Sequence, residues 1–66
     1  MTVKDVLELY DNWNIHVVVN DMNFCRIAYG TGLETYHNKT VNGLIVKSFG
    51  FYDGEFCIRV DKIFGE

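Results

Sequence analysis

The chain has 66 residues, of which 48% are hydrophobic and 15% aromatic, and it carries a formal net charge of −3. A chain of this length forms a single domain, 1–66, and its apolar content excludes a disordered protein. The six cationic residues are scattered, so no basic stripe is available to follow a phosphate backbone. Duplex nucleic acid is therefore not an expected partner.

The N-terminus and the cysteines bear on the location of the protein. Met1 is followed by Thr-Val-Lys-Asp, and no run approaches the roughly 18 apolar residues of a membrane span. The sequence thus predicts a cytoplasmic protein with no membrane partner. In the reducing cytoplasm, Cys25 and Cys57 would be free thiols packed like small hydrophobic side chains.

Residues 2–10 predict a short amphipathic helix. Thr2 can cap this helix, and Asp5, three residues later, completes a weak capping box. The helix is too short to be stable alone, so its apolar face must lie on a sheet. That face consists of Val3, Val6, Leu7 and Tyr10, which have the spacing of one helical stripe.

Residues 13–29 predict a first β-hairpin whose register depends on its loop. A two-residue loop would place Phe24 and Arg26 on the face of the first strand's apolar residues. A three-residue loop, closed by Asn23 in the left-handed conformation, would make that face wholly apolar. It would consist of Trp13, Ile15, Val17 and Val19 with Cys25, Ile27 and Tyr29. We favour this second register, which leaves His16 and Arg26 on the other face.

The segment 30–43 has frequent glycine and asparagine residues and few apolar anchors. A structureless connection of this length is uncommon in so small a domain, so we expect a turn of helix or a short strand at 33–36. The segment is also the best candidate for a functional loop.

The last third of the chain, 44–60, predicts a second β-hairpin. Two apolar runs flank Asp53-Gly54, a pair that favours a two-residue type I′ turn. Tyr52 would then lie opposite Glu55. The inner face would carry an aromatic-rich stripe of Phe49, Phe51, Phe56, Ile58 and Val60.

Lys47 is the one break in the inner pattern of this hairpin. Its side chain could reach solvent at the margin of the sheet, or a β-bulge within Ser48-Phe49-Gly50 could turn Val46 inward. The pattern leaves both arrangements open.

Together these elements predict an α+β fold, with one N-terminal helix packed on an antiparallel sheet of about four strands arranged as two hairpins. A parallel arrangement is not expected, because its crossover connection would need more chain than is available. Trp13 and the phenylalanines of the second hairpin would belong to the core.

Four stretches carry a resemblance to known proteins: 2–5, 15–19, 30–31 and 56–60. In these stretches, and in the order of its elements, the chain resembles a loose group of very small proteins from phages and mobile elements of Gram-positive bacteria. The aromatic-rich second hairpin and the polar loop 36–38 depart from that group. The group has no common function, so the resemblance implies only a genomic context, in which small proteins often bind and block host factors or defence components.

The sequence predicts no metal, no cofactor and no catalytic activity. The two histidines and two cysteines lack the spacing of a metal site, and His16 faces away from Cys25 in the favoured register. A nucleophile and base pair such as Cys57 with His37 would need a concave pocket, for which a domain of this size has little volume.

Aromatic residues without a clear inner position are the best candidates for binding. They are Phe24, Tyr36, Tyr52 and Phe64. They either close the margin of a small core or of a dimer, or form a protein-binding surface. With their polar neighbours they give six candidate binding residues. These are Tyr36, His37, Asn38, Phe24, Arg26 and Tyr52.

Two functions from different classes are compatible with these features. The first is a non-catalytic protein-binding module, such as a phage-type inhibitor of a host or defence protein, acting through the 30–43 loop and the exposed aromatics. The second is a small-ligand or nucleotide-binding homo-oligomer, with a pocket formed between subunits by Tyr36, His37 and Arg26. The open sheet edges and the apolar composition also predict a homodimer, held by sheet extension or by face packing of the second hairpin.

Overall fold

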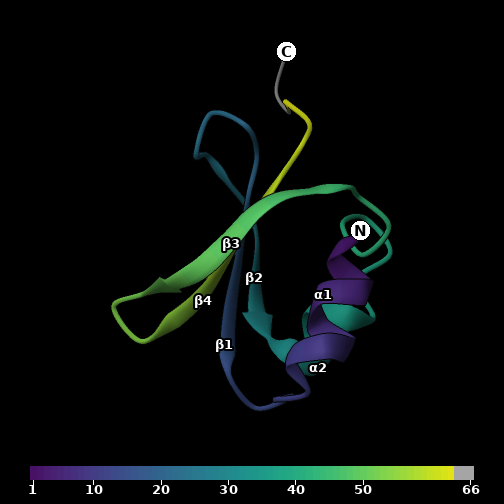
Figure 1. Cartoon of the computed structure of the whole chain (residues 1–66), viewed down its shortest axis with the longest axis vertical. Helices are drawn as coiled ribbons and strands as arrows, with labels where there is room; N and C mark the ends of the chain where they lie inside the picture. Colours follow the sequence, from purple (N-terminus) through teal and green to yellow (C-terminus); the bar gives the residue numbers. More distant parts are fainter. Residues whose placement is uncertain (64–66) are drawn as a thin grey trace.

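The computed structural model describes residues 1–63 and contains two helices and one four-stranded sheet. The elements are α1 (Val3–Tyr10), β1 (His16–Asn20), β2 (Arg26–Thr31), α2 (Gly32–Tyr36), β3 (Val46–Tyr52) and β4 (Glu55–Val60). The strand order is β2-β1-β4-β3, and both helices lie to one side of the sheet (Figure 1). The predicted α+β class with four strands in two hairpins is confirmed. Phe64 lies outside the described residues.

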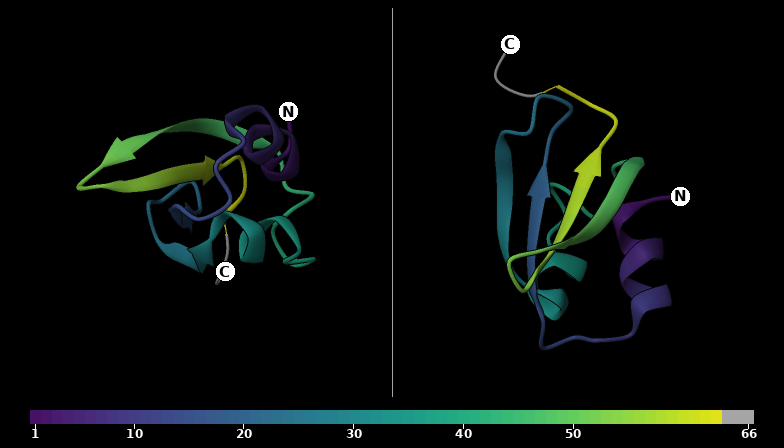
Figure 2. Two further views of the ribbon diagram at one scale, coloured as in Figure 1. Left: turned by 90° about the horizontal axis from the view of Figure 1, so that it is seen from below. Right: turned by 60° about the vertical axis from the view of Figure 1, so that its left-hand side comes forward.

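The sheet is mixed, so the prediction of a wholly antiparallel sheet is wrong at its centre. Each hairpin is antiparallel, but β1 pairs with β4 in parallel, from Val17 opposite Phe56 to Asn20 opposite Arg59. The crossover that this requires is present, because residues 32–45, including α2, return the chain from the end of β2 to the start of β3. The two most apolar strands thereby occupy the centre, where both of their edges are paired (Figure 2).

The helix α1 begins and ends as its sequence predicts. The Thr2 side chain accepts from the Asp5 amide at 3.2 Å, and the Asp5 carboxylate accepts from the Thr2 amide at 3.0 Å. The hydrogen bond that the Thr2 backbone amide donates to the Asp5 carboxylate, and next the Thr2 side chain, lower the pKa of Asp5. At the other end, Asp11 adopts the left-handed conformation and its amide donates to the Leu7 carbonyl.

The hydrophobic core lies between α1 and one face of the sheet. Both hairpins contribute to it, and the apolar face of α1 packs against their central strands β1 and β4. Its buried members are Val3, Val6, Leu7, Val17, Val19, Val41, Phe56, Ile58 and Val60. Trp13 and Ile15 pack at its margin, in the irregular segment before β1 rather than in a strand as predicted.

The first hairpin has neither of the loops considered from sequence. Val19 lies opposite Ala28 and Val18 opposite Tyr29, with a bulge at the Asn20 end. The loop spans 21–25 because the buried Asp21 carboxylate accepts from the amides of Asn23 and Cys25, at 2.9 and 3.0 Å. Phe24, not Asn23, takes the left-handed conformation, with φ of 64°. Consequently Tyr29 faces away from the core, and Cys25 is exposed rather than packed inside.

The helix α2 supplies the turn of helix expected at 33–36. It has its own capping box, in which Thr31 and Glu34 bond each other's amides at 2.9 and 3.1 Å. Gly32 allows close packing, since a Cβ there would lie 2.9 Å from the Asn12 carbonyl oxygen. The start of α2 is therefore packed tightly against the segment that precedes β1.

The second hairpin confirms its predicted turn and register. Asp53 and Gly54 have φ of 52° and 79°, as a type I′ turn requires, and Tyr52 lies opposite Glu55. A bulge turns Val46 toward the core, as in one of the two arrangements left open by the sequence, but it lies at Lys47 and not within Ser48-Phe49-Gly50, where the pairing with β4 is regular.

The aromatic stripe of this hairpin is only partly buried, contrary to the prediction. Phe56 is in the core, but Phe49 is 56% exposed and Phe51 is 52% exposed. The reason is that β3 is an edge strand and α1 is short, so α1 reaches this part of the hairpin with its last residues, among them Tyr10, whose ring packs on Phe51 and Phe56.

The burial of Ile58 predicts a stability difference between two chemically identical changes. Ile58→Val removes a methylene from the core and should lower the free energy of unfolding by about 1 kcal/mol. Ile45→Val, at an exposed isoleucine, should change it by less than about 0.5 kcal/mol. Urea denaturation followed by circular dichroism measures both. Equal effects would contradict the described core.

The turn conformation predicts a second difference. Gly54→Ala places a Cβ in the left-handed region and should lower the free energy of unfolding by about 1 to 2 kcal/mol. Gly43→Ala is the matched control, because a Cβ there meets no atom within 4 Å and its φ is not positive. The same urea titration checks this pair, and a Gly43→Ala loss as large as that of Gly54→Ala would refute the turn assignment.

Candidate functional site

The side of the sheet that faces away from the helices, here called the open face, carries a mixed set of side chains. Residues paired across neighbouring strands share a face, so the registers define its members. They are His16, Val18 and Asn20 of β1, Tyr29 of β2, Ser48, Gly50 and Tyr52 of β3, and Glu55, Cys57 and Arg59 of β4. No helix of the described residues covers this face (Figure 2).

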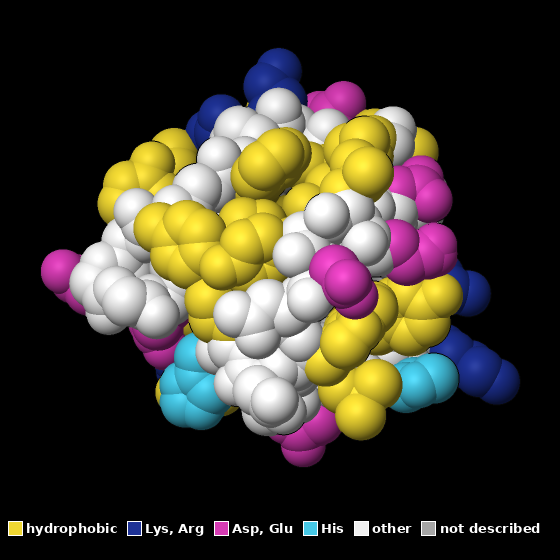
Figure 3. All heavy atoms as spheres, turned by 60° about the horizontal axis from the view of Figure 1, so that its bottom comes forward, with side chains coloured by type: hydrophobic (Ala, Val, Ile, Leu, Met, Phe, Trp, Pro, Cys, Tyr) yellow, Lys and Arg dark blue, Asp and Glu magenta, His cyan; other side chains and the backbone are white. Residues whose placement is uncertain are grey.

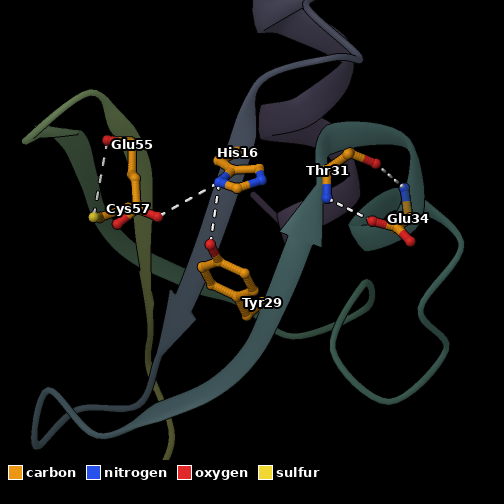
Figure 4. Close-up of polar contacts among 6 residues, drawn as sticks. All are labelled: His16, Tyr29, Thr31, Glu34, Glu55 and Cys57. Atoms are coloured by element: carbon orange, nitrogen blue, oxygen red, sulfur yellow. Dashed lines mark hydrogen bonds and ion pairs between the residues drawn. The ribbon is translucent and has the colours of Figure 1, made fainter.

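His16 stands at the centre of one end of the open face. Its Nδ1 atom is 3.1 Å from the Tyr29 hydroxyl and 3.7 Å from a carboxylate oxygen of Glu55. The three side chains come from β2, β1 and β4 and point toward one another (Figure 4). A polar chain therefore crosses three strands at this end of the face.

The other end of the open face contains a hollow of about 420 Å³. It is lined by Asn20, Phe24, Ser48, Phe49, Tyr52, Cys57 and Arg59. The Arg59 guanidinium lies over the Phe24 ring, 4.6 Å from its centre, and the Arg59 Nε donates to the Ser48 hydroxyl at 3.2 Å. The exposed aromatic ring and the cation are thus held in place against each other.

Three of the six candidate binding residues lie on or beside the open face. Phe24 and Tyr52 line the hollow and are 70% and 68% exposed. Arg26 lies at the start of β2, where its guanidinium is 5.2 Å from the centre of the Tyr29 ring. Phe24 and Arg26 are far from Tyr52 in the sequence, and the sheet brings the three residues to one surface.

The other three candidates lie at the end of α2, on the helix side. The Tyr36 ring packs edge-on against Trp13 and its hydroxyl donates to Glu8 at 3.3 Å. Burial, and next the Glu8 carboxylate, raise the pKa of this tyrosine. The His37 ring packs against Tyr36, and the Asn38 carbonyl accepts two amides of the following turn. These residues hold α2 and its loop in place.

Arg26 and the pair Tyr36 and His37 are not brought together within one chain. Arg26 begins β2, whereas Tyr36 and His37 follow the far end of that strand, beyond α2. A pocket formed by these residues would therefore need a second subunit.

A second hollow, here called the helix-side groove, lies between α1 and the second hairpin. Its volume is about 330 Å³, and its lining is almost wholly apolar. It is formed by Val6, Leu9, Tyr10, Phe49, Gly50, Phe51 and Phe56. Figure 3 shows hydrophobic side chains gathered over this part of the surface, between the hairpin and α1.

The sequence did not single out several residues of these two surfaces. The predicted inner stripe of the second hairpin omits Arg59 and Glu55, and no sequence pattern indicated that they lie beside the first hairpin. Tyr29 was missed because the favoured register turned it inward. Leu9 of the groove lies outside the apolar stripe of α1 and is 73% exposed, and no sequence pattern singled it out.

The described side chains do not form the nucleophile and base pair considered from sequence. Cys57 lies on the open face, while His37 lies beyond α2 on the helix side. Burial, and next the Glu55 and Asp53 carboxylates, raise the pKa of Cys57, which disfavours the reactive thiolate. Within residues 1–63, no group of three or more histidine, cysteine or acidic side chains could hold a metal ion.

Comparison with known proteins gives no further guide. No family model, no curated protein and no solved structure matches this chain. None of the helices in the described part of the chain is long and apolar enough to cross a membrane.

The raised pKa of Cys57 predicts its reactivity. In a Cys25→Ser variant, the pH at which alkylation by iodoacetamide reaches half its maximal rate should lie higher in the folded protein than in urea, because unfolding removes the burial and the nearby acidic groups. Mass spectrometry of quenched samples measures the rate. The same midpoint in both states would contradict the described environment of this thiol.

Proposed function

We propose that the protein is a non-catalytic protein-binding module that contacts its partner with the open face of the sheet. The observation that carries this proposal is the position of Phe24 and Tyr52, two large aromatics that remain about 70% exposed beside a preformed hollow. Exposed aromatic rings and arginines are the side chains that contribute most to protein interfaces.

The charges near the hollow favour a protein over a phosphate backbone. Arg26 and Arg59 are offset by Glu55 and by Asp53 at the hairpin turn, and the whole chain is acidic. A mixed surface of this kind suits the polar rim of a protein interface.

Preorganisation supports the same proposal. Phe24 is held by the left-handed backbone of a loop that the buried Asp21 ties together, and Arg59 is fixed between its ring and Ser48. Side chains ordered in the free protein lose less conformational entropy on binding. The resemblance to phage and mobile-element proteins would make the partner a host or defence protein, and binding would block it.

A small ligand is the second candidate for the same hollow. Its volume of about 420 Å³ falls within the range of small-molecule sites, and the stacked Phe24 and Arg59 could hold a planar anionic ligand such as a nucleotide. A nucleotide that raises the melting temperature, and whose effect disappears in Arg59→Gln, would favour this alternative.

The proposal predicts a position-dependent capture of the partner. With a photoreactive phenylalanine analogue at position 24 or 52, irradiation in host extract should cross-link the same protein, whereas the analogue at position 33 should not. Leu33 is a matched control because it is 52% exposed but lies on α2, away from the open face. Mass spectrometry identifies the cross-linked species.

Competition then tests the role of the two aromatics. Unlabelled wild-type protein should displace the captured partner, and a Phe24→Ala, Tyr52→Ala protein should do so at least tenfold less well, because each truncation removes an exposed contact. Both side chains are largely solvent-exposed, so the variant should keep its melting temperature. Cross-links of equal yield at 24, 52 and 33, or equal competition by the folded variant, would contradict the proposal.

A further inference from the structure

The strand β3 presents a free backbone edge. It ends the sheet on one side, and only its start is covered, where Val46 donates its amide to the Met1 carbonyl at 2.8 Å and Ile45 bridges to Thr2. From residue 47 to residue 52, no strand of the described chain pairs with β3 on the side away from β4. An exposed edge of this kind can pair with another strand.

The hairpin geometry decides which backbone groups point outward. In a two-residue hairpin, the residues that flank the turn exchange both of their hydrogen bonds, so Tyr52 bonds Glu55. Hydrogen bonding alternates along a strand, and Gly50 therefore also points its backbone groups toward β4. Phe49 and Phe51 point theirs toward the free edge.

The apolar side chains at this edge also lack a cover. Phe49 and Phe51 are more than half exposed and flank the helix-side groove, together with Leu9 and Tyr10 of α1. Unpaired hydrogen-bonding groups and an apolar groove thus occur side by side on the same strand.

We propose that the partner of this surface is a second copy of the chain, and that β3 pairs antiparallel with the partner's β3 about a twofold axis at Gly50. Each Phe49 then lies opposite the partner's Phe51, and these two pairs make the interstrand hydrogen bonds. The two sheets join into one sheet of eight strands. The aromatic rings of each copy lie over the partner's helix-side groove.

Charge complementarity selects this register among those that the backbone allows. Pairing about Gly50 places Lys47 opposite the partner's Asp53, and symmetry forms this pair twice. Pairing about Phe49 would instead oppose Lys47 to the partner's Phe51. Pairing about Phe51 would oppose Phe49 to the partner's Asp53. Of these three registers, only the one about Gly50 both pairs Phe49 with the partner's Phe51 and places Lys47 opposite an acidic side chain.

Gly50 itself suits the centre of this interface. In the proposed register it lies opposite the partner's Gly50 in a pair without hydrogen bonds, where the Cα atoms approach to about 4.5 Å. A Cβ at this position would meet the Tyr52 ring of its own chain at 3.6 Å, an ordinary contact. A cysteine is therefore tolerated there and would face its symmetry mate.

The first test is oligomeric state with a charge exchange. Light scattering at micromolar concentration should report about twice the chain mass of 7.7 kDa. Lys47→Glu and Asp53→Lys, each alone, create two repulsive pairs and should weaken self-association at least tenfold. Their mixture should restore it, because the mixed dimer has two attractive pairs. A wild-type monomer at this concentration overturns the proposal, and so does a mixture of the two folded variants that stays monomeric.

The second test reads the register directly and does not depend on Asp53→Lys, which replaces a residue in the left-handed conformation of the turn. In a Cys25→Ser, Cys57→Ala background, Gly50→Cys should form a disulfide-linked dimer under mild oxidation. Ser48→Cys should not, because its mate lies across four residues of strand. Non-reducing electrophoresis measures both. The Gly50 register is overturned if Ser48→Cys forms the linked dimer and Gly50→Cys does not, or if neither variant forms it.

Discussion

The parallel pairing of β1 with β4 is the contact on which the rest of the structure depends. It joins two hairpins that could each form only a half-covered surface, and it brings Val17 and Val19 beside Phe56 and Ile58. This pairing is here called the seam. The helix α1 can bury its apolar face only because the seam places residues of both hairpins beneath it. Without the seam, neither hairpin has enough apolar neighbours to be stable alone, and the open face would be two separate strips.

Features decided within a few residues could be predicted from the sequence, and features decided by distant contacts could not. The capping box at Thr2 and the turn at Asp53-Gly54 each depend on neighbours that the sequence shows directly. The first hairpin differed because one buried carboxylate, Asp21, binds two amides of its own loop and lengthens it. The parallel pairing of β1 with β4 was not predicted, because no local sequence pattern indicates which distant strands pair. The exposure of Phe49 and Phe51 follows from the shortness of α1 relative to the hairpin.

The same division explains the candidate site. Phe24 and Tyr52 could be recognised as aromatics without an inner position, and they do lie together on the open face. Tyr36, His37 and Asn38 gave a similar signal, yet they pack α2 against the preceding segment and cap its end. Polarity and aromaticity alone do not separate a residue that supports a loop from one that faces a partner. The proposed dimer edge and the proposed binding face share the strand β3, because Phe49 lines both hollows and Ser48 and Tyr52 line the open-face hollow.

The seam between β1 and β4 also has a consequence for how the protein folds. Hairpins and short capped helices form from nearby residues on the microsecond timescale, whereas the seam joins positions as far apart as 17 and 56. Loop-closure entropy must be overcome before that contact contributes any stabilisation. We therefore expect the transition state for folding to be reached when the two preformed hairpins dock. Substitutions at the seam would then slow folding. Substitutions at the Asp53-Gly54 turn would also slow folding, because that turn is formed before the hairpins dock.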